Sequence, residues 1–210
     1  MFNWLGDMLR VKDDYYRIGK TWTFHTWLKS QLQENRPWDE LVHDMLTAEG
    51  RLGAIGATAY LLRDASMPLD SLSNTLTTFL GANVACAQCH DHPFAEWTQP
   101  QFEGLAAYYG QVQFREARVQ DTRSRPFVIE DDRTQEERTV PPEVPFEPRW
   151  VPKTKHLRAK LAAWVTHPEN RRFRRAVANR VWGLMLGRPF VSPVDDLPDP
   201  SSLDNPDVLD

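Results

Sequence analysis

The segment Cys86-Ala87-Gln88-Cys89-His90 is the most informative one in this 210-residue sequence. It holds both cysteines of the chain and one of its six histidines. Two cysteines are too few for a disulfide framework in a chain of this length. Their spacing, with a histidine directly after the second one, is instead the attachment signature of c-type haem.

Each residue type in this pattern has a chemical reason. Two thiols three positions apart on one helical turn can form thioethers with the two vinyl groups of one porphyrin. The adjacent histidine then places an imidazole nitrogen under the iron as the proximal ligand. We therefore name Cys86 and Cys89 as candidate attachment residues for one covalently bound haem c, and His90 as the candidate iron ligand.

Three other interpretations of the two cysteines stay open at this point. A zinc site can use Cys86, Cys89 and a histidine of the pair His90 and His92, but no second Cys-x-x-Cys closes a tetrahedron. A redox dithiol would use the thiols alone, but the βαβ context of thioredoxin-like motifs is missing. The two cysteines can also be structural thiols with a coincidental spacing.

Methionine and histidine residues elsewhere are candidates for a second axial ligand. Met67 lies in the loop Ser66-Met67-Pro68, from which a thioether can be presented to iron, and it is our candidate distal ligand. Met45 falls on an apolar helical stripe, so we expect it to fill the core. His43 lies off that stripe, and we expect an ordinary surface or hydrogen-bonded histidine there.

Apolar residues recur at helical spacing through most of the chain. The stripes predict helices near residues 24–35, 37–46, 70–81, 98–109, 157–165 and 173–184. Asp70 is the candidate N-cap of the third helix, and Gly81 is its C-terminal stop. Between residues 111 and 152, six prolines exclude a long helix, and Phe127-Val128-Ile129 can form one strand of a hairpin.

The predicted fold class is therefore mainly α. Residues 1–112 are expected to form an irregular helical domain of the cytochrome c type, and residues 113–152 a Pro-rich linker with room for a short β hairpin. Residues 153–210 are expected to form a second helical unit. The longest unbroken apolar runs have five residues, so the sequence predicts no membrane span.

The net charge of −4 argues against nucleic acid as the default partner. The basic run Arg171-Arg172-Phe173-Arg174-Arg175 is expected to be a solvated helix face, with some arginines paired to Asp195, Asp196 and Asp199. No residue pattern identifies a substrate, so the sequence assigns no catalysis.

The longer stretch from Cys86 to Phe94, CAQCHDHPF, resembles the planctomycete cytochrome-like domain of unknown function, a family found in large secreted proteins. Further stretches that carry the resemblance are Asn35-Arg36-Pro37-Trp38-Asp39, Thr47-Ala48, Tyr60-Leu61-Leu62-Arg63, Phe79-Leu80-Gly81 and Trp97-Thr98-Gln99. Residues from Leu161 onward, among them Asn179-Arg180-Val181-Trp182-Gly183 and Pro193-Val194-Asp195-Asp196, look like the start of the uncharacterised domain that usually follows.

The resemblance implies that Cys86 and Cys89 attach haem and that His90 is an axial ligand, and it names no distal ligand. It also implies an extracytoplasmic location, either periplasmic or secreted. Because family members extend further at both ends, we expect the chain to be a fragment, in which the lack of a signal peptide carries no weight.

The function expected from these observations is covalent haem binding and electron transfer, as a module of a larger secreted protein. Its expected partners are a redox protein or other domains of the full-length chain. The alternative is a structural zinc or thiol site in a scaffold domain of a secreted carbohydrate-associated protein with no redox role.

Overall fold

The computed structural model describes residues 1–11, 22–65, 67–93, 95, 97–122, 126–130, 134–199, 202–205 and 207–210. The α-helices in these segments are α1 (Phe2–Met8), α2 (Trp22–Gln33), α3 (Trp38–Thr47), α4 (Thr58–Leu62), α5 (Pro68–Leu80), α6 (Gln99–Ala106), α7 (Leu157–Val165) and α8 (Arg171–Leu186). The 3-10 helices are η1 (Ala85–Gln88), η2 (Ala107–Tyr109) and η3 (Pro148–Trp150). The strands are β1 (Gly50–Arg51), β2 (Val112–Arg115), β3 (Arg118–Asp121), β4 (Phe127–Glu130) and β5 (Glu137–Val140).

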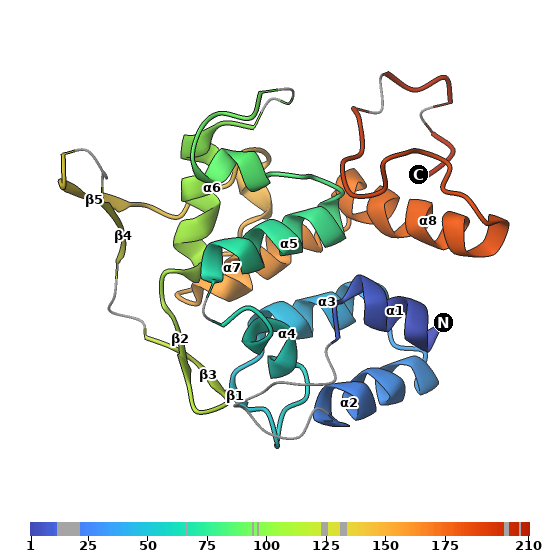
Figure 1. Cartoon of the computed structure of the whole chain (residues 1–210), viewed down its shortest axis with the longest axis horizontal. Helices are drawn as coiled ribbons and strands as arrows, with labels where there is room; N and C mark the ends of the chain where they lie inside the picture. Colours follow the sequence, from blue (N-terminus) through green and yellow to red (C-terminus); the bar gives the residue numbers. More distant parts are fainter. Residues whose placement is uncertain are drawn as a thin grey trace.

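The fold is mainly α, as the sequence predicted. Strands β1, β3 and β2 form a small antiparallel sheet in that order, and β4 pairs with β5 in a separate hairpin. Figure 1 shows both sheets at one side of the molecule, away from α8 and from the two chain ends. Among the described segments, no helix combines the length and the apolar character needed to cross a membrane.

One hydrophobic core connects the early helices with the late ones. Helix α7 packs against α3 and η2, and α8 packs against α5 (Figure 1). Trp164 of α7 is fully buried in the same cluster as Tyr60 and Phe79. The core is thus continuous across residues 112 and 152, and the domain boundaries placed there stay predictions.

Helix α5 begins three residues before the start that the predicted N-cap implied. Its N-cap position is Met67, and Pro68 occupies the first turn, where its fixed φ angle and missing N–H group cost nothing. The prediction of Asp70 as N-cap was therefore wrong, and Asp70 lies within the first turn. The predicted stop at Gly81 is confirmed, since Gly81 adopts the left-handed conformation with φ 57°.

The hairpin of β2 and β3 lies largely in the segment interpreted as a linker and was not predicted. Phe114 pairs with Val119 across it, and the turn consists of Glu116 and Ala117, both with positive φ. Such turns favour Asn or Gly, whose absence removed the usual hairpin signal. The predicted strand at residues 127–129 is confirmed as part of β4.

Candidate functional site

The candidate site is the cysteine turn, residues 85–90, which follows the end of α5. The turn is compact, because the backbone N–H groups of Cys89 and His90 both donate to the carbonyl of Cys86, with N···O distances of 3.2 and 3.3 Å. Cys86 and Cys89 are free thiols exposed to solvent, and the His90 side chain is exposed as well. The structure thus brings the three predicted residues together on one open turn.

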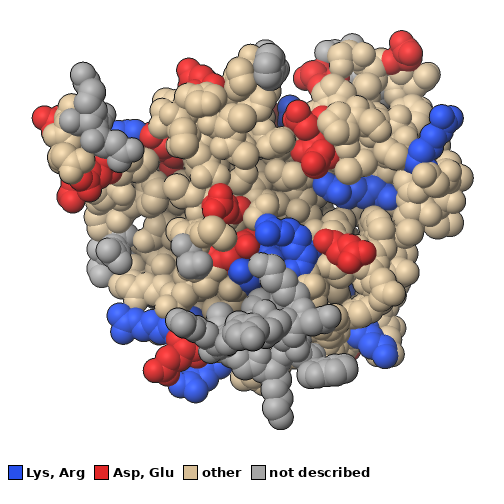
Figure 2. Space-filling view, in the orientation of Figure 1, with Lys and Arg blue, Asp and Glu red and all other residues tan. Residues whose placement is uncertain are grey.

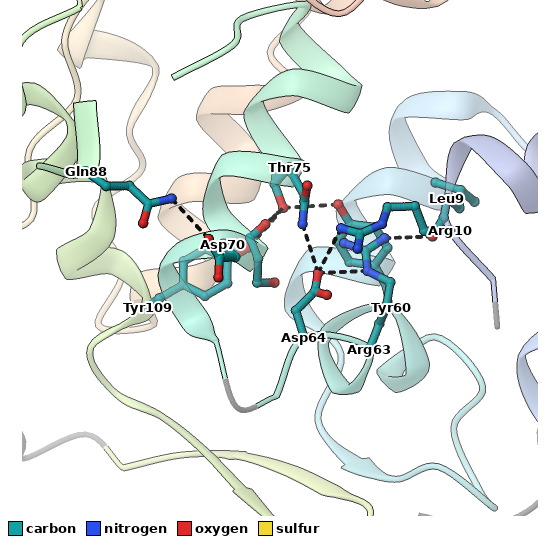
Figure 3. Close-up of polar contacts among 11 residues, drawn as sticks. Leu9, Arg10, Tyr60, Arg63, Asp64, Asp70, Thr75, Gln88 and Tyr109 are labelled. Carbon is teal, nitrogen blue, oxygen red and sulfur yellow. Dashed lines mark hydrogen bonds and ion pairs between the residues drawn. The ribbon is translucent and has the colours of Figure 1, made fainter. Parts of the chain in front are cut away.

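The residues between the two cysteines hold the turn against the core. Ala87 is fully buried in the hydrophobic cluster. The side-chain amide of Gln88 donates to the Asp70 carboxylate at 3.2 Å, a contact between the turn and the first turn of α5 (Figure 3). A site supported by a rigid helix is positioned more precisely than one on a free loop.

The residue after the turn orients the imidazole. Nδ1 of His90 lies 2.7 Å from the backbone carbonyl of Asp91. A carbonyl oxygen can only accept, so Nδ1 carries a proton in this contact, and in the neutral tautomer with that proton Nε2 is the nitrogen with the lone pair. The Asp91 carboxylate accepts a hydrogen bond from the backbone N–H of Gln99, the first residue of α6, at 2.8 Å. Asp91, whose carbonyl contacts the imidazole, is thereby tied to the start of α6.

The other residues singled out from the sequence lie in different environments. Met67 is half exposed, immediately before the helix whose first turn contacts Gln88. Met45 is fully buried in the core, as predicted. His43 is partly buried on α3. Phe94, the last residue of the CAQCHDHPF stretch, lies outside the described residues.

A cluster of three hydroxyl side chains, those of Tyr60, Thr75 and Tyr109, is buried between α4, α5 and η2. The hydroxyl of Thr75 donates to the Ser71 carbonyl at 2.8 Å, so it accepts from the phenols of Tyr60 at 3.0 Å and Tyr109 at 3.3 Å (Figure 3). Burial is the main cause that raises the pKa of the Tyr109 phenol above its ordinary value, and the charge of Tyr60 adds to it. These hydroxyls hold the elements behind the cysteine turn together.

An ion pair extends this network toward α1. The Nε atom of Arg63 donates to the Asp64 carboxylate at 2.8 Å, and both side chains are 1% exposed. Arg63 also donates to the backbone carbonyl of Leu9 at 2.7 Å (Figure 3). The sequence did not reveal this pair, because two charged residues after the apolar run 59–62 are equally typical of an exposed helix end.

Two arginines of the basic run on α8, Arg171 and Arg175, pair with Asp210. Arg175 makes a two-pronged contact with the Asp210 carboxylate at 2.7 and 2.6 Å, and Arg171 contacts the same group. These contacts hold the Asp210 pKa below its usual value, with the Arg175 hydrogen bond as the largest cause. On the face of the molecule drawn in Figure 2, acidic and basic side chains of the described residues are interspersed.

The cysteine turn brings together the residue types that haem attachment needs. Two exposed thiols and an imidazole with a free Nε2 are the groups that thioether attachment and iron ligation need. Structural zinc needs a closed set of four ligands. Within the described part of the chain, neither cysteine belongs to a group of three potential ligands whose ligand atoms lie within 4.8 Å of one another.

Comparison with known proteins gives two family matches. Residues 1–114 match the PSCyt2 family, a protein of unknown function (DUF1549), and residues 157–210 match the PSD1 family, likewise of unknown function (DUF1553). No curated protein and no solved structure matches the chain. The two matches confirm that a second domain follows the first.

Proposed function

The chain belongs to the PSCyt2 family (DUF1549), and from the geometry of its cysteine turn we propose that it binds one c-type haem covalently and transfers electrons as a module of a larger secreted protein. One observation carries the proposal. Cys86, Cys89 and His90 are exposed together, while the intervening Ala87 is buried and Gln88 is tied to α5.

The chain's own residues have separate tasks in this proposal. Cys86 and Cys89 would hold the haem, each through a thioether made by adding its S–H bond across one vinyl group, with no net oxidation or reduction. His90 offers Nε2 to the iron, and the Asp91 carbonyl keeps the proton on Nδ1. The haem, when bound, supplies reversible one-electron exchange between ferric and ferrous iron.

Met67 is the proposed distal ligand. Its thioether is half exposed, and it directly precedes the helix turn that contacts Gln88 through Asp70. Methionine ligation raises the reduction potential of a haem iron relative to ligation by two histidines. The proposed location is extracytoplasmic, and the proposed partner is a redox protein or another domain of the full-length chain.

The test is export of the 210-residue chain to a periplasm that has c-type haem maturation machinery. We expect haem that survives a denaturing gel, a reduced-minus-oxidised spectrum with a c-type band, and loss of both in the Cys86→Ser/Cys89→Ser double variant. A folded wild-type chain without covalent haem would overturn the proposal. Zinc that is present in this chain and lost in the Cys86→Ser/Cys89→Ser double variant would favour a thiol–zinc scaffold.

The axial ligands are tested separately in the haem-loaded chain. His90→Ala is expected to keep the covalent haem and lose the low-spin spectrum. Met67→Leu is expected to lower the reduction potential, whereas Met185→Leu, an exposed methionine on α8, is the matched control and leaves it unchanged. Equal potentials in the two methionine variants would remove Met67 from the proposal and leave the attachment residues in place.

A further inference from the structure

Three side chains of metal-binding type meet at a place away from the cysteine turn. Glu49 follows α3, Asp121 is the last residue of β3, and His156 is the N-cap residue of α7. Their ligand atoms, one from each side chain, all lie within 4.8 Å of one another. These residues come from three segments far apart in the sequence, so the folded structure alone creates the group.

Arg158 fixes the geometry of this group. Its Nε atom donates to Oδ1 of Asp121 at 2.8 Å, and Nη1 donates to the backbone carbonyls of Leu46 and Ala48 at 2.9 and 3.0 Å. The Arg158 and Asp121 side chains are 3% and 7% exposed. The carboxylate of Asp121 is therefore held in place through its Oδ1 atom. Through the carbonyls of Leu46 and Ala48, Arg158 also holds the backbone that leads to Glu49.

The charges at this place leave room for a cation. Two carboxylates stand against one guanidinium, whose Nη2 atom is 3.7 Å from Oε1 of Glu49. Without the imidazole, these charged side chains sum to one negative charge. A buried arginine that holds one oxygen of a ligating carboxylate acts as an outer partner, the kind of contact that orients metal ligands in proteins.

We propose that Glu49, Asp121 and His156 bind a divalent transition-metal ion of the zinc class. An imidazole nitrogen with two carboxylate oxygens suits Zn²⁺, which commonly has three protein ligands plus water, whereas Mg²⁺ and Ca²⁺ favour all-oxygen sets. The ion links the corner after α3, the end of β3 and the start of α7. Its role is to clamp these three segments, and it is independent of the haem proposed at the cysteine turn.

The test uses the 210-residue chain with Cys86→Ser and Cys89→Ser, so that thiols do not compete for the metal. After chelator treatment, Zn²⁺, Mg²⁺ and Ca²⁺ are titrated by calorimetry, and thermal unfolding is followed at each concentration. We expect one Zn²⁺ per chain, with a higher Tm at saturation, and no comparable effect of Mg²⁺ or Ca²⁺. Absence of Zn²⁺ binding would mean that Arg158 is the only cation of the group, and would overturn the proposal.

Two variants assign the bound ion to these residues. His156→Asn removes the imidazole but keeps a residue type that N-caps helices well, so α7 remains intact. It is expected to weaken Zn²⁺ binding at least about tenfold. His43→Asn on α3 is the matched control and leaves binding unchanged. If both variants bind Zn²⁺ like the parent, the ion lies elsewhere and the assignment is wrong.

Discussion

In the cysteine turn, adjacent residues have opposite environments. Cys86 and Cys89 face solvent, while Ala87 is buried and Gln88 reaches Asp70. The chemistry of the cysteines and histidine was predictable, because it depends on residue spacing within five positions. The hydrogen bond between Gln88 and Asp70, which supports the turn, was not predictable from the sequence. It depends on how the loop after Gly81 runs back along α5.

The Tyr109 phenol makes the free energy of unfolding depend on pH in alkaline solution. Its pKa is raised in the folded chain, mainly by burial, so the folded state holds the proton more tightly than the unfolded state. Its contribution is fully present below the unfolded value of about 10, and it is lost as pH rises above that value. We expect Tyr109→Phe to reduce the loss of unfolding free energy that the wild type shows above about pH 10.

Urea unfolding at a series of pH values measures this effect. At neutral pH, Tyr109→Phe is expected to cost about 1 kcal/mol, because the hydrogen bond with Thr75 is lost. The difference between wild type and variant should then shrink as the solution becomes more alkaline. A constant difference across the whole pH range would contradict the prediction.

At the scale of elements, Gly81 joins three parts of the molecule. It ends α5 in the left-handed conformation, begins the path to the cysteine turn, and accepts a hydrogen bond from the backbone N–H of Leu197 at 2.7 Å. A Cβ atom at this position would lie 2.7 Å from Cγ of Leu197. We expect Gly81→Ala to lower the free energy of unfolding by about 1–3 kcal/mol, from the φ angle and the contact together.

The matched control is Gly53→Ala. Gly53 has no heavy atom within 4 Å of an added Cβ, and its φ angle lies outside the positive range that strains other residues. Its substitution is expected to change stability by less than about 0.5 kcal/mol. Chemical denaturation of both variants gives the comparison, and equal effects would show that neither the backbone conformation nor Leu197 matters at residue 81.

The elements themselves were predictable where a long apolar stripe marks them. Helices α3, α7 and α8 follow their stripes, and α6 also has the capping box of Thr98 and Gln101. The small sheet was missed because β1 has two residues and the turn before β3 lacks Asn or Gly. The cluster of Glu49, Asp121 and His156 was missed because no local spacing connects its members.

At the scale of the whole molecule, Trp164 tests whether the two matched segments unfold together. Its fully buried ring packs 4.6 Å from the ring of Phe146, and its indole N–H donates to the Phe146 carbonyl at 2.9 Å. Because α7 lies against α3 and η2, a cavity here affects elements of both segments. We expect Trp164→Ala to destabilise the chain by about 3–5 kcal/mol in a single transition.

Two probes with different origins distinguish one cooperative unit from two. Far-UV circular dichroism follows all helices, and hydrogen exchange of the α5 amides follows the helix before the cysteine turn. In Trp164→Ala, the unfolding transitions followed by the two probes are expected to move together to lower urea concentration, since α3, α5 and α7 share one core. Trp182→Ala, whose side chain is 36% exposed, is the control with a much smaller shift. Loss of α7 and α8 at low urea, with α5 still protected, would show that the second segment unfolds alone and that the continuous core does not couple them.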